Sequence, residues 1–188
     1  MSILINIFHY IYQACSDFLR GLFRRSDTIY FETSQISVRI QDTRSANIGE
    51  GAFSTVYRVK DEGSHKVYAL KQMIVQSSEY YDIAKIEIEA FKKFHHKYLL
   101  RLIDSLETQH KGHRTIFLLL PYYSRGSLRG FLNEVLDGST TKPPLLAVLR
   151  DFKHICEGLS VLHNYQPSYV HQDIKPEVSF HLIREKVP

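Results

Sequence analysis

Two glycines and an aromatic residue in the first third of this sequence could bind the phosphates of a nucleotide. Gly49 and Gly51 lie between two short alternating stretches, which predict a strand, a turn and a second strand. Because glycine lacks a Cβ, backbone N–H groups at these positions can close over a triphosphate. Phe53 at the tip of the turn is then explained as a lid over the phosphates. Two glycines in a hairpin carry little weight alone, so the prediction depends on the residues that follow.

A lysine in an apolar strand is the next residue that could do chemistry. Lys71 lies in a strand that we expect over residues 66–72, and a buried ammonium without a partner is costly. Glu87 is the natural partner, since it shares one face of a helix expected over residues 79–94 with Ile83. Such an ion pair would hold the lysine extended toward the α- and β-phosphates. The competing interpretation is that both residues are solvated surface charges.

The apolar run that ends at residue 120 is followed by a connector that could bind a purine. Leu120 would close the back of an adenine pocket. Pro121 has no N–H but keeps a carbonyl that can accept a hydrogen bond from the adenine amino group, and Tyr123 offers an N–H donor. A proline that simply ends the strand before a loop explains these residues equally well.

A second carboxylate and a second lysine occur late in the chain. Asp173 could act as the base or orienting group for a substrate hydroxyl, and Lys175 could neutralise a phosphoryl group in transfer. They follow a long helix expected over residues 145–163 and a short strand expected at residues 169–170. That context makes a chance His-x-Asp sequence an improbable explanation.

The elements that must position these residues fall into two groups. The first contains short strands and one inserted helix, and the second contains only helices, which together predict an α+β protein of two parts. The turn chemistry at residues 61–64 and 109–113 predicts two hairpins. We expect five strands, the first marked by alternation at residues 38–40 and 46–48 and the others over residues 56–58, 66–72, 101–107 and 114–120. Helices are expected over residues 79–94, 127–136 and 145–163.

Composition limits the classes of function. The 188 residues carry a formal net charge of +4 and a pI of about 9.0, with 24 basic side chains scattered among 20 acidic ones. This pattern favours anionic ligands such as phosphates or membrane lipids and does not indicate a nucleic-acid partner. Cys15 and Cys156 are too few and too far apart for a disulfide framework, so we expect a reducing, cytoplasmic compartment. No stretch approaches the roughly 20 uncharged apolar residues that a spanning helix needs.

Residues 3–25 have the pattern of an amphipathic helix. Apolar side chains fall on one side and polar ones on the other, and Arg20, Arg24 and Arg25 gather toward the end. The stripe would suit an anionic bilayer surface. Packing on the body of the protein, binding to a partner helix and a secretory signal peptide remain the alternatives. Position 2 is serine, which excludes N-myristoylation, and Cys15 is a weak candidate for palmitoylation.

Taken together, these motifs resemble those of a eukaryotic protein kinase, and most closely the Numb-associated kinase group with its small, lipid-anchored, Golgi-associated branch. The matching segments are residues 49–54, 68–71, 118–128 and 155–159, and the likeness spans about residues 44–177. It implies a bilobal fold, Mg–ATP as cofactor, protein Ser/Thr hydroxyls as substrates and a peripheral place on intracellular, Golgi-like membranes.

The resemblance also implies an organisation and further site residues. A helix and linker would occupy residues 1–35, a five-stranded antiparallel N-lobe with one helix residues 36–120, and the hinge with an incomplete helical C-lobe residues 121–188. Ile48, Val56 and Ala69 join the nucleotide-binding residues. Phe91, Leu102 and His171 would stack inside the protein and link the two lobes.

The sequence departs from the kinase pattern after Asp173. Gln172 replaces an arginine that usually reads a phosphorylated activation loop, and Val178 stands where the family places a metal-binding asparagine. No Asp-Phe-Gly follows, and residues 178–188 have the texture of a divergent tail. Two hypotheses follow. The chain is a truncated form of an active Ser/Thr kinase, or it is a catalytically inactive fragment that binds a nucleotide or a partner.

The expected long helix has implications for folding. Its apolar residues cover much of its circumference, so we expect a large exposed apolar surface and poor solubility of the isolated chain. The apolar residues are Leu145, Leu149, Phe152, Ile155, Cys156, Leu159 and Leu162.

Overall fold

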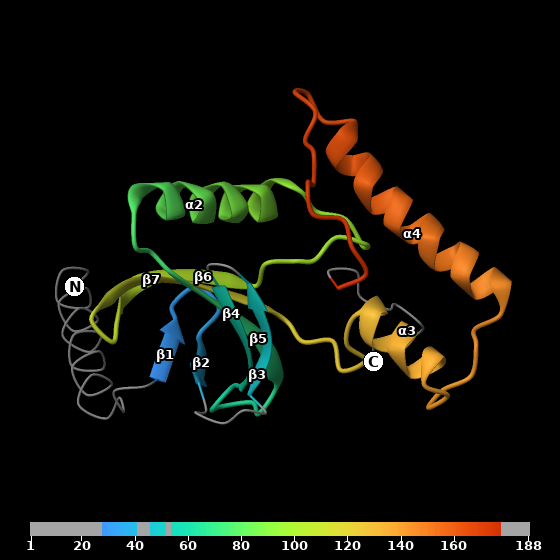
Figure 1. Ribbon diagram of the computed structural model, residues 1–188. Helices are drawn as coiled ribbons and strands as arrows, with labels where there is room; N and C mark the ends of the chain where they lie inside the picture. The colour runs from blue at the N-terminus through green and yellow to red at the C-terminus, as the bar shows by residue number, and fades with distance from the viewer. Residues whose placement is uncertain (1–27, 41–45, 52–53, 178–188) are drawn as a thin grey trace, which may run out of the picture.

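The computed structural model describes residues 28–40, 46–51 and 54–177. The amphipathic stripe of residues 3–25, the proposed lid residue Phe53 and the segment 178–188 lie outside these residues. Figure 1 shows the described chain as a sheet with a helix along one side, joined to a second part made of two further helices. The α+β class expected from the sequence is confirmed.

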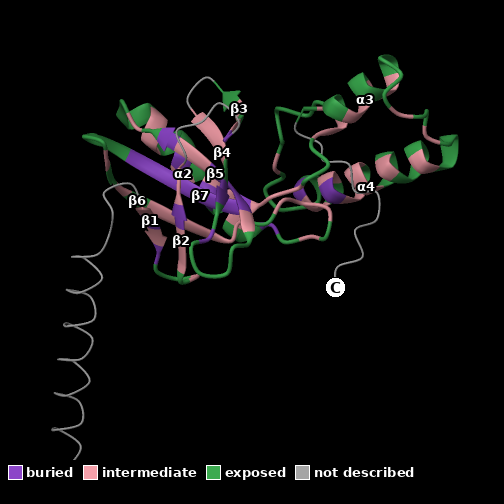
Figure 2. Cartoon of the chain, turned by 90° about the horizontal axis from the view of Figure 1, so that it is seen from below, coloured by how far each residue is buried: buried purple, intermediate pink, exposed green. Residues whose placement is uncertain are grey.

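A five-stranded antiparallel sheet forms the first part. Its strand order is β3-β4-β5-β7-β6, and helix α2 is inserted between β5 and β6. Strand β7 lies between β5 and β6, and Figure 2 shows that most of it is buried. The bounds are β3 Asn47–Gly51, β4 Ser54–Lys60, β5 Val67–Ile74, α2 Ser78–Lys93, β6 Asp104–His110 and β7 His113–Pro121.

Helix α2 packs on one face of the sheet, called the front face below. Ser77 caps the helix by accepting a hydrogen bond from the Tyr80 N–H. Ala84 and Ile88 are the buried residues of the helix and pack with front-face side chains of β5 and β7. Ile83 is 52% exposed, on the same flank of the helix as Glu87. The small Ala84 side chain lets the helix approach the sheet, so the buried row runs through Ala84 and Ile88 and leaves Ile83 on its flank.

A two-stranded hairpin covers the opposite, back face of the sheet. It consists of β1 (Thr28–Phe31) and β2 (Ile36–Arg39), paired antiparallel. Residues 28–31 were expected to be part of a linker, but Ile29 and Phe31 point inward and are 4% and 1% exposed. They complete a core with back-face side chains of β5 and β7, among them Leu70, Phe117 and Leu119. Burial of these two apolar side chains explains why so short a strand forms.

Two aspartates fasten the hairpin to the sheet. Asp61, which is 7% exposed, accepts hydrogen bonds from the Ser37 N–H at 3.2 Å and from the Ser64 N–H and hydroxyl at 2.8 and 2.6 Å. Asp104 on β6 accepts from the Ser34 N–H at 2.8 Å. The hairpin is therefore attached at two points. Strand β2 is attached to the turn between β4 and β5, and the β1–β2 turn is attached to β6.

Helices α3 (Leu128–Leu136) and α4 (Leu145–His163) form the second part. As expected, α4 exposes apolar side chains: Leu145, Leu146, Leu149 and Phe152 are each more than half exposed. None of the helices in the described ranges has the length and apolar character to cross a bilayer.

The expected short strand at residues 169–170 does not form. The Tyr169 N–H donates instead to the Leu162 carbonyl at 3.0 Å, and the Tyr169 ring contacts Phe94 with centroids 5.0 Å apart. The segment therefore folds back on the end of α4, and its backbone hydrogen bond goes to that helix.

Replacing Asp61 by asparagine tests the attachment of the hairpin. Burial alone would raise the pKa of Asp61, but the hydrogen bonds from Ser64 and Ser37 outweigh it and hold the pKa below 3.8. A carboxyl with a lowered folded pKa contributes stability above the unfolded pKa, and this stability is lost as the pH falls through the folded value. We expect Asp61→Asn to lower the free energy of unfolding by about 2 kcal/mol at pH 7. The difference from wild type should shrink below about pH 3.8.

Urea unfolding at several pH values measures this difference, and Asp82→Asn on the exposed side of α2 is the matched control. A loss of stability that is the same at pH 7 and pH 3 would contradict the assignment.

Candidate active site

The register of the sheet aligns most of the predicted nucleotide-binding residues on the front face. Gly49 pairs with Val56, and Val56 pairs with Lys71. Two residues along β5, Ala69 pairs with Leu120. Directly paired residues share a face of a sheet, and so do residues two apart in a strand. Five predicted residues on four strands therefore lie on one surface.

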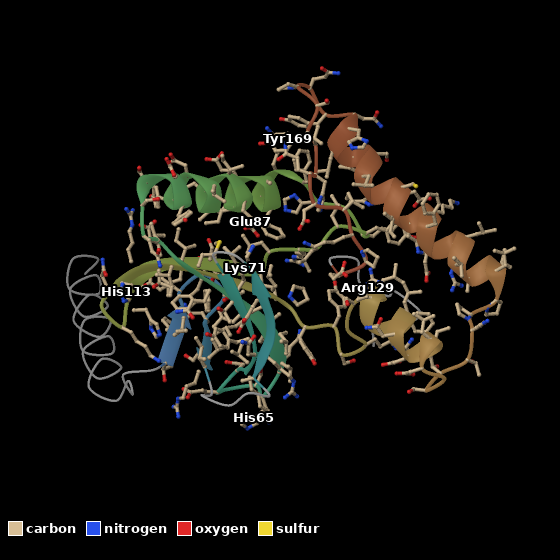
Figure 3. The ribbon with its side chains drawn as sticks, viewed as in Figure 1. His65, Lys71, Glu87, His113, Arg129 and Tyr169 are labelled. Carbon is tan, nitrogen blue, oxygen red and sulfur yellow. The ribbon has the colours of Figure 1, made fainter. Side chains whose placement is uncertain are left out.

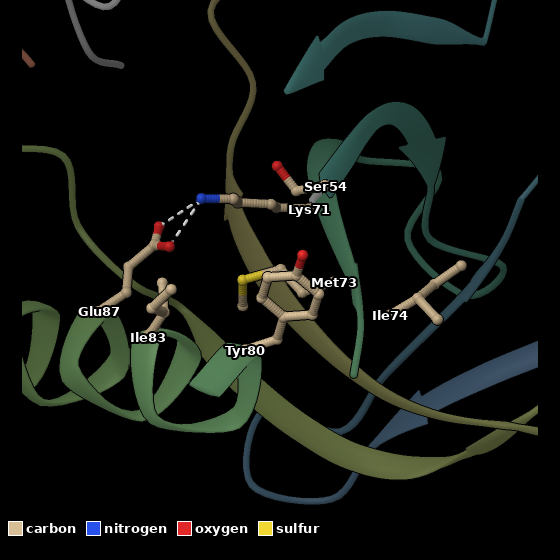
Figure 4. Close-up of a pocket in the computed structure, with 7 residues that line it drawn as sticks. All are labelled: Ser54, Lys71, Met73, Ile74, Tyr80, Ile83 and Glu87. Atoms are coloured by element: carbon tan, nitrogen blue, oxygen red, sulfur yellow. Dashed lines mark hydrogen bonds and ion pairs between the residues drawn. The ribbon is translucent and has the colours of Figure 1, made fainter. Parts of the chain in front are cut away.

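Lys71 and Glu87 form the ion pair that the sequence predicted. The Lys71 ammonium lies 2.7 Å from each Glu87 carboxylate oxygen, and the two side chains are 22% and 30% exposed. Figures 3 and 4 show the lysine reaching from β5 toward α2 and meeting the glutamate there. The two oxygens satisfy the ammonium within the protein while leaving the pair open to solvent on one side.

A pocket of about 140 Å³ adjoins this ion pair. It lies between β5 and α2, and Ile83 lines it together with the pair itself (Figure 4). The exposure of Ile83 thus gives the pocket part of its apolar wall. The lining residues are Ser54, Lys71, Met73, Ile74, Tyr80, Ile83 and Glu87.

The two predicted glycines differ in their surroundings. A Cβ on Gly51 would lie 3.1 Å from the Ser54 hydroxyl, a tight contact. A Cβ on Gly49 would meet nothing closer than Val56 at 3.8 Å. The protein's own packing therefore leaves room for a side chain at Gly49. The Gly49 N–H already donates to the Asn47 side-chain oxygen at 3.1 Å. Ile48 lies at an irregularity in the β3–β4 pairing and is 45% exposed.

The connector after β7 begins as predicted. Leu120 is 6% exposed and Pro121 is the last residue of the strand, paired with Tyr68. Tyr123 is half-buried, and its carbonyl accepts from the Gly126 N–H at 3.1 Å. Ala69 and Leu120 thus form a closed apolar floor next to the residues expected to bind a purine.

Asp173 and Lys175 contact each other on the second part of the chain. The Lys175 ammonium lies 2.9 Å from an Asp173 oxygen, and the two side chains are 49% and 61% exposed. The hydrogen bond to Asp173 raises the pKa of Lys175. Both side chains are accessible to a substrate.

The prediction that His171 stacks inside the protein is wrong. Its ring is exposed, and its Nδ1 accepts from the Asp173 N–H at 3.4 Å. Phe91 and Leu102 do pack against the front-face core. Aromatic contacts between the two parts are made by other residues, among them Tyr169 on Phe94 at the end of α2 and His154 of α4 on Tyr98.

Sequence reasoning missed an aromatic cluster that joins α2 to the segment before Asp173. The Phe94 ring makes edge contacts with Tyr165 and Tyr169 at centroid distances of 5.3 and 5.0 Å. The Lys93 ammonium lies 4.2 Å from the Tyr165 centroid and 5.1 Å from that of Tyr169. Figure 3 shows Tyr169 beside the end of α2. Scattered tyrosines give no sequence signal for such a contact.

Arg129 was missed as well. Its backbone N–H donates to the Pro176 carbonyl at 3.0 Å, and its guanidinium donates to Glu177 at 2.8 Å. The hydrogen bond from Arg129 lowers the pKa of Glu177. The first turn of α3 therefore holds the residues that follow Lys175.

Truncating Phe94 tests the junction between the two parts. Phe94 is 7% exposed, and we expect Phe94→Ala to reduce the free energy of unfolding by about 3 kcal/mol, as usual for a buried phenylalanine. Amide hydrogen exchange over residues 165–173 should accelerate, because Tyr165 and Tyr169 lose their common contact. Phe152→Ala, at a site 63% exposed, is the control and should change stability little. Equal effects of the two substitutions would contradict the assignment.

Comparison with known proteins identifies the family. The protein kinase domain matches residues 43–180. A probable serine/threonine-protein kinase of Dictyostelium discoideum is 42% identical over 135 residues, which cover 69% of this chain and 37% of that protein. Serine/threonine-protein kinase ENV7 of Saccharomyces cerevisiae is 34% identical over 146 residues, 70% of this chain and 40% of that protein.

Human serine/threonine-protein kinase 16 is 30% identical over 131 residues, which cover 69% of this chain and 41% of that protein. The chain therefore spans about two fifths of the length of these three relatives. With a matched domain over most of its residues, this chain belongs to the protein kinase domain family, and its relatives are serine/threonine kinases.

Proposed function

We propose that this chain binds ATP on the front face of its sheet. In the whole protein this face would serve phosphoryl transfer from ATP to a Ser or Thr hydroxyl. The observation that carries the proposal is the Lys71–Glu87 pair, with both oxygens 2.7 Å from the ammonium. A half-buried lysine held by one carboxylate can still donate to a phosphate on its open side.

The adenine ring lies over the apolar floor of Ala69 and Leu120, with Val56 and Ile48 above it. The Pro121 carbonyl accepts from the adenine amino group, and the Tyr123 N–H donates to the ring. The phosphates run along β3, where the room above Gly49 admits them, toward Lys71. This path follows the alignment of these residues on one face.

Asp173 accepts or orients the substrate hydroxyl, and Lys175 neutralises the phosphoryl group in transfer. Their exposure and mutual contact at 2.9 Å suit both roles. Mg²⁺ accompanies ATP in this family. In residues 28–40, 46–51 and 54–177, no three His, Cys, Asp or Glu side chains converge on a metal position.

A non-catalytic role as a nucleotide- or partner-binding module is the second candidate. The apolar side chains that α4 exposes favour it, because a surface of this kind commonly binds a protein partner. Nucleotide binding is common to both candidates, and transfer of the γ-phosphoryl group separates them.

Substitutions of Lys71 and Asp173 test both candidates. Lys71→Ala should weaken ATP binding at least about tenfold, because a charged hydrogen bond to the phosphates is lost. Asp173→Asn should leave ATP affinity within about twofold of wild type but abolish transfer of radiolabel to a protein acceptor. A fluorescent ATP analogue measures binding. Lys66→Ala is the matched control, because Lys66 is an exposed lysine directly before β5.

Binding that depends on Lys71 without any transfer by wild type would select the non-catalytic role. ATP affinity equal in wild type and Lys71→Ala would contradict both candidates.

We also propose that residues 3–25 bind the surface of intracellular, Golgi-like membranes from the cytoplasm. The apolar stripe and the arginines at its end support this, as does the likeness of residues 118–128 to the Numb-associated group. Phe18→Ser should reduce binding to phosphatidylserine-containing vesicles by at least about tenfold, since about 1.5–3 kcal/mol of apolar burial is lost.

Gln13→Ser on the polar side is the control, and cosedimentation measures the bound fraction. Equal binding by the two variants would contradict the membrane role and favour packing on the protein body or on a partner helix.

A further inference from the structure

Four side chains form a polar cluster between α2 and the β6–β7 hairpin, called the α2 anchor below. Arg114 donates from its Nε to a Glu107 oxygen at 2.7 Å and also contacts that oxygen through Nη2. The Tyr81 hydroxyl donates to the other Glu107 oxygen at 3.3 Å, and the Lys85 ammonium lies 3.5 Å from it. The Arg114 guanidinium also lies 3.9 Å from the Tyr81 ring centroid.

The anchor and Glu87 lie on opposite flanks of α2. Each residue turns an α-helix by about 100°. Relative to the buried Ala84, Tyr81 and Lys85 then lie about 60–100° to one side, whereas Glu87 lies about 60° to the other. The anchor flank faces β6 and β7, and the Glu87 flank faces Lys71 on β5. Ala84 and Ile88 form the line of contact between the two flanks.

A small rotation of α2 about its own axis would separate Glu87 from Lys71. Side chains extend to a radius of about 5–6 Å, so a rotation of about 30° moves their ends by about 3 Å. That displacement exceeds what a hydrogen bond of 2.7 Å tolerates. Ala84 and Ile88 are the buried contacts of α2 with the sheet, and Phe91 and Tyr81 pack partly buried against the same core. Because so few side chains of the helix are fully buried, contacts on its flanks contribute to its angle.

We propose that the α2 anchor sets the rotation of α2 and thereby keeps Glu87 on Lys71, which makes Arg114 and Glu107 positioning residues for the phosphate-binding lysine. This inference rests on the ATP-binding role proposed above. The hydrogen bond with Arg114 lowers the pKa of Glu107, so the anchor keeps its charges at neutral pH.

Exposed ion pairs add little to global stability, about 0–1 kcal/mol. Arg114 and Glu107 are exposed, with side chains 45% and 33% accessible. Removing the anchor should therefore change the rotation of α2 while leaving the unfolding temperature of the protein nearly unchanged. This difference separates a positioning role from a merely structural one.

The experiment compares the full chain with Arg114→Gln. The control is Arg39→Gln, which breaks the Arg39–Glu62 pair on the back hairpin, away from α2. Amide hydrogen exchange over residues 82–90 reports the helix, and the dissociation constants of ATP and adenosine report the phosphate site. We expect faster exchange over 82–90, ATP binding weaker by about five- to tenfold and adenosine binding unchanged in Arg114→Gln only.

A double-mutant cycle with Glu87→Gln tests the coupling. Arg114→Gln should have no further effect on ATP binding once Glu87 is neutral, because the anchor acts through that carboxylate. Additive losses, or an equal loss of ATP and adenosine affinity, would overturn the inference. Tyr81→Phe removes only the hydroxyl contact and should give a smaller change of the same sign, so it replaces Arg114→Gln if that variant fails to fold.

The two proposals fail in different ways. If wild type binds ATP no more tightly than adenosine, the phosphate-binding role of Lys71 fails, and hydrogen exchange alone then decides on the anchor. Unchanged protection of residues 82–90 in Arg114→Gln overturns the anchor whatever the nucleotide affinities are.

Discussion

An ammonium group on an otherwise apolar sheet face is the constraint on which the rest of the site depends. Lys71 lies among front-face side chains such as Ala69, Met73 and Leu118, and it would be costly there without an anion. Glu87 provides that anion from a different element, so the position of α2 on the sheet is part of the electrostatics of the site. A movement of α2 would carry Glu87 away from Lys71 and so change the electrostatic environment that a ligand meets at the ammonium.

The two faces of the sheet have different roles. The back face is sealed by the β1–β2 hairpin, whose attachment at Asp61 and Asp104 leaves the apolar side chains of β5 and β7 enclosed. The front face carries α2 and the residues aligned with Lys71. Because the back face stabilises the sheet, the front face can keep a pocket and half-buried charges without loss of the fold. The cluster around Phe94 then connects α2 to the segment that leads to Asp173.

Local pattern and charge were sufficient to predict much of the fold and the central pair of the site. Alternating residues and turn chemistry predicted the five strands and α2, and the need to neutralise Lys71 selected Glu87. The strand at residues 28–31 was missed because four residues with two apolar side chains resemble a linker until the sheet they cover is known. Helical periodicity placed Ile83 on the same face as Glu87, and both residues line the pocket beside Lys71.

The remaining misses are contacts between distant parts of the chain. Arg129 and Glu177 are 48 residues apart, and Arg114 meets Tyr81 across two different elements. His171 failed as an internal residue because Tyr169 takes the contact with α2, which no local pattern distinguishes.

The most direct measurement of the central claim is a crystal structure of this chain with a non-hydrolysable ATP analogue. The account predicts the Lys71 ammonium within hydrogen-bond distance of an α- or β-phosphate oxygen while Glu87 still accepts from it, with the adenine between Ala69, Leu120 and Val56. A nucleotide bound on another surface, or phosphates placed with Lys71 and Glu87 apart, would contradict it.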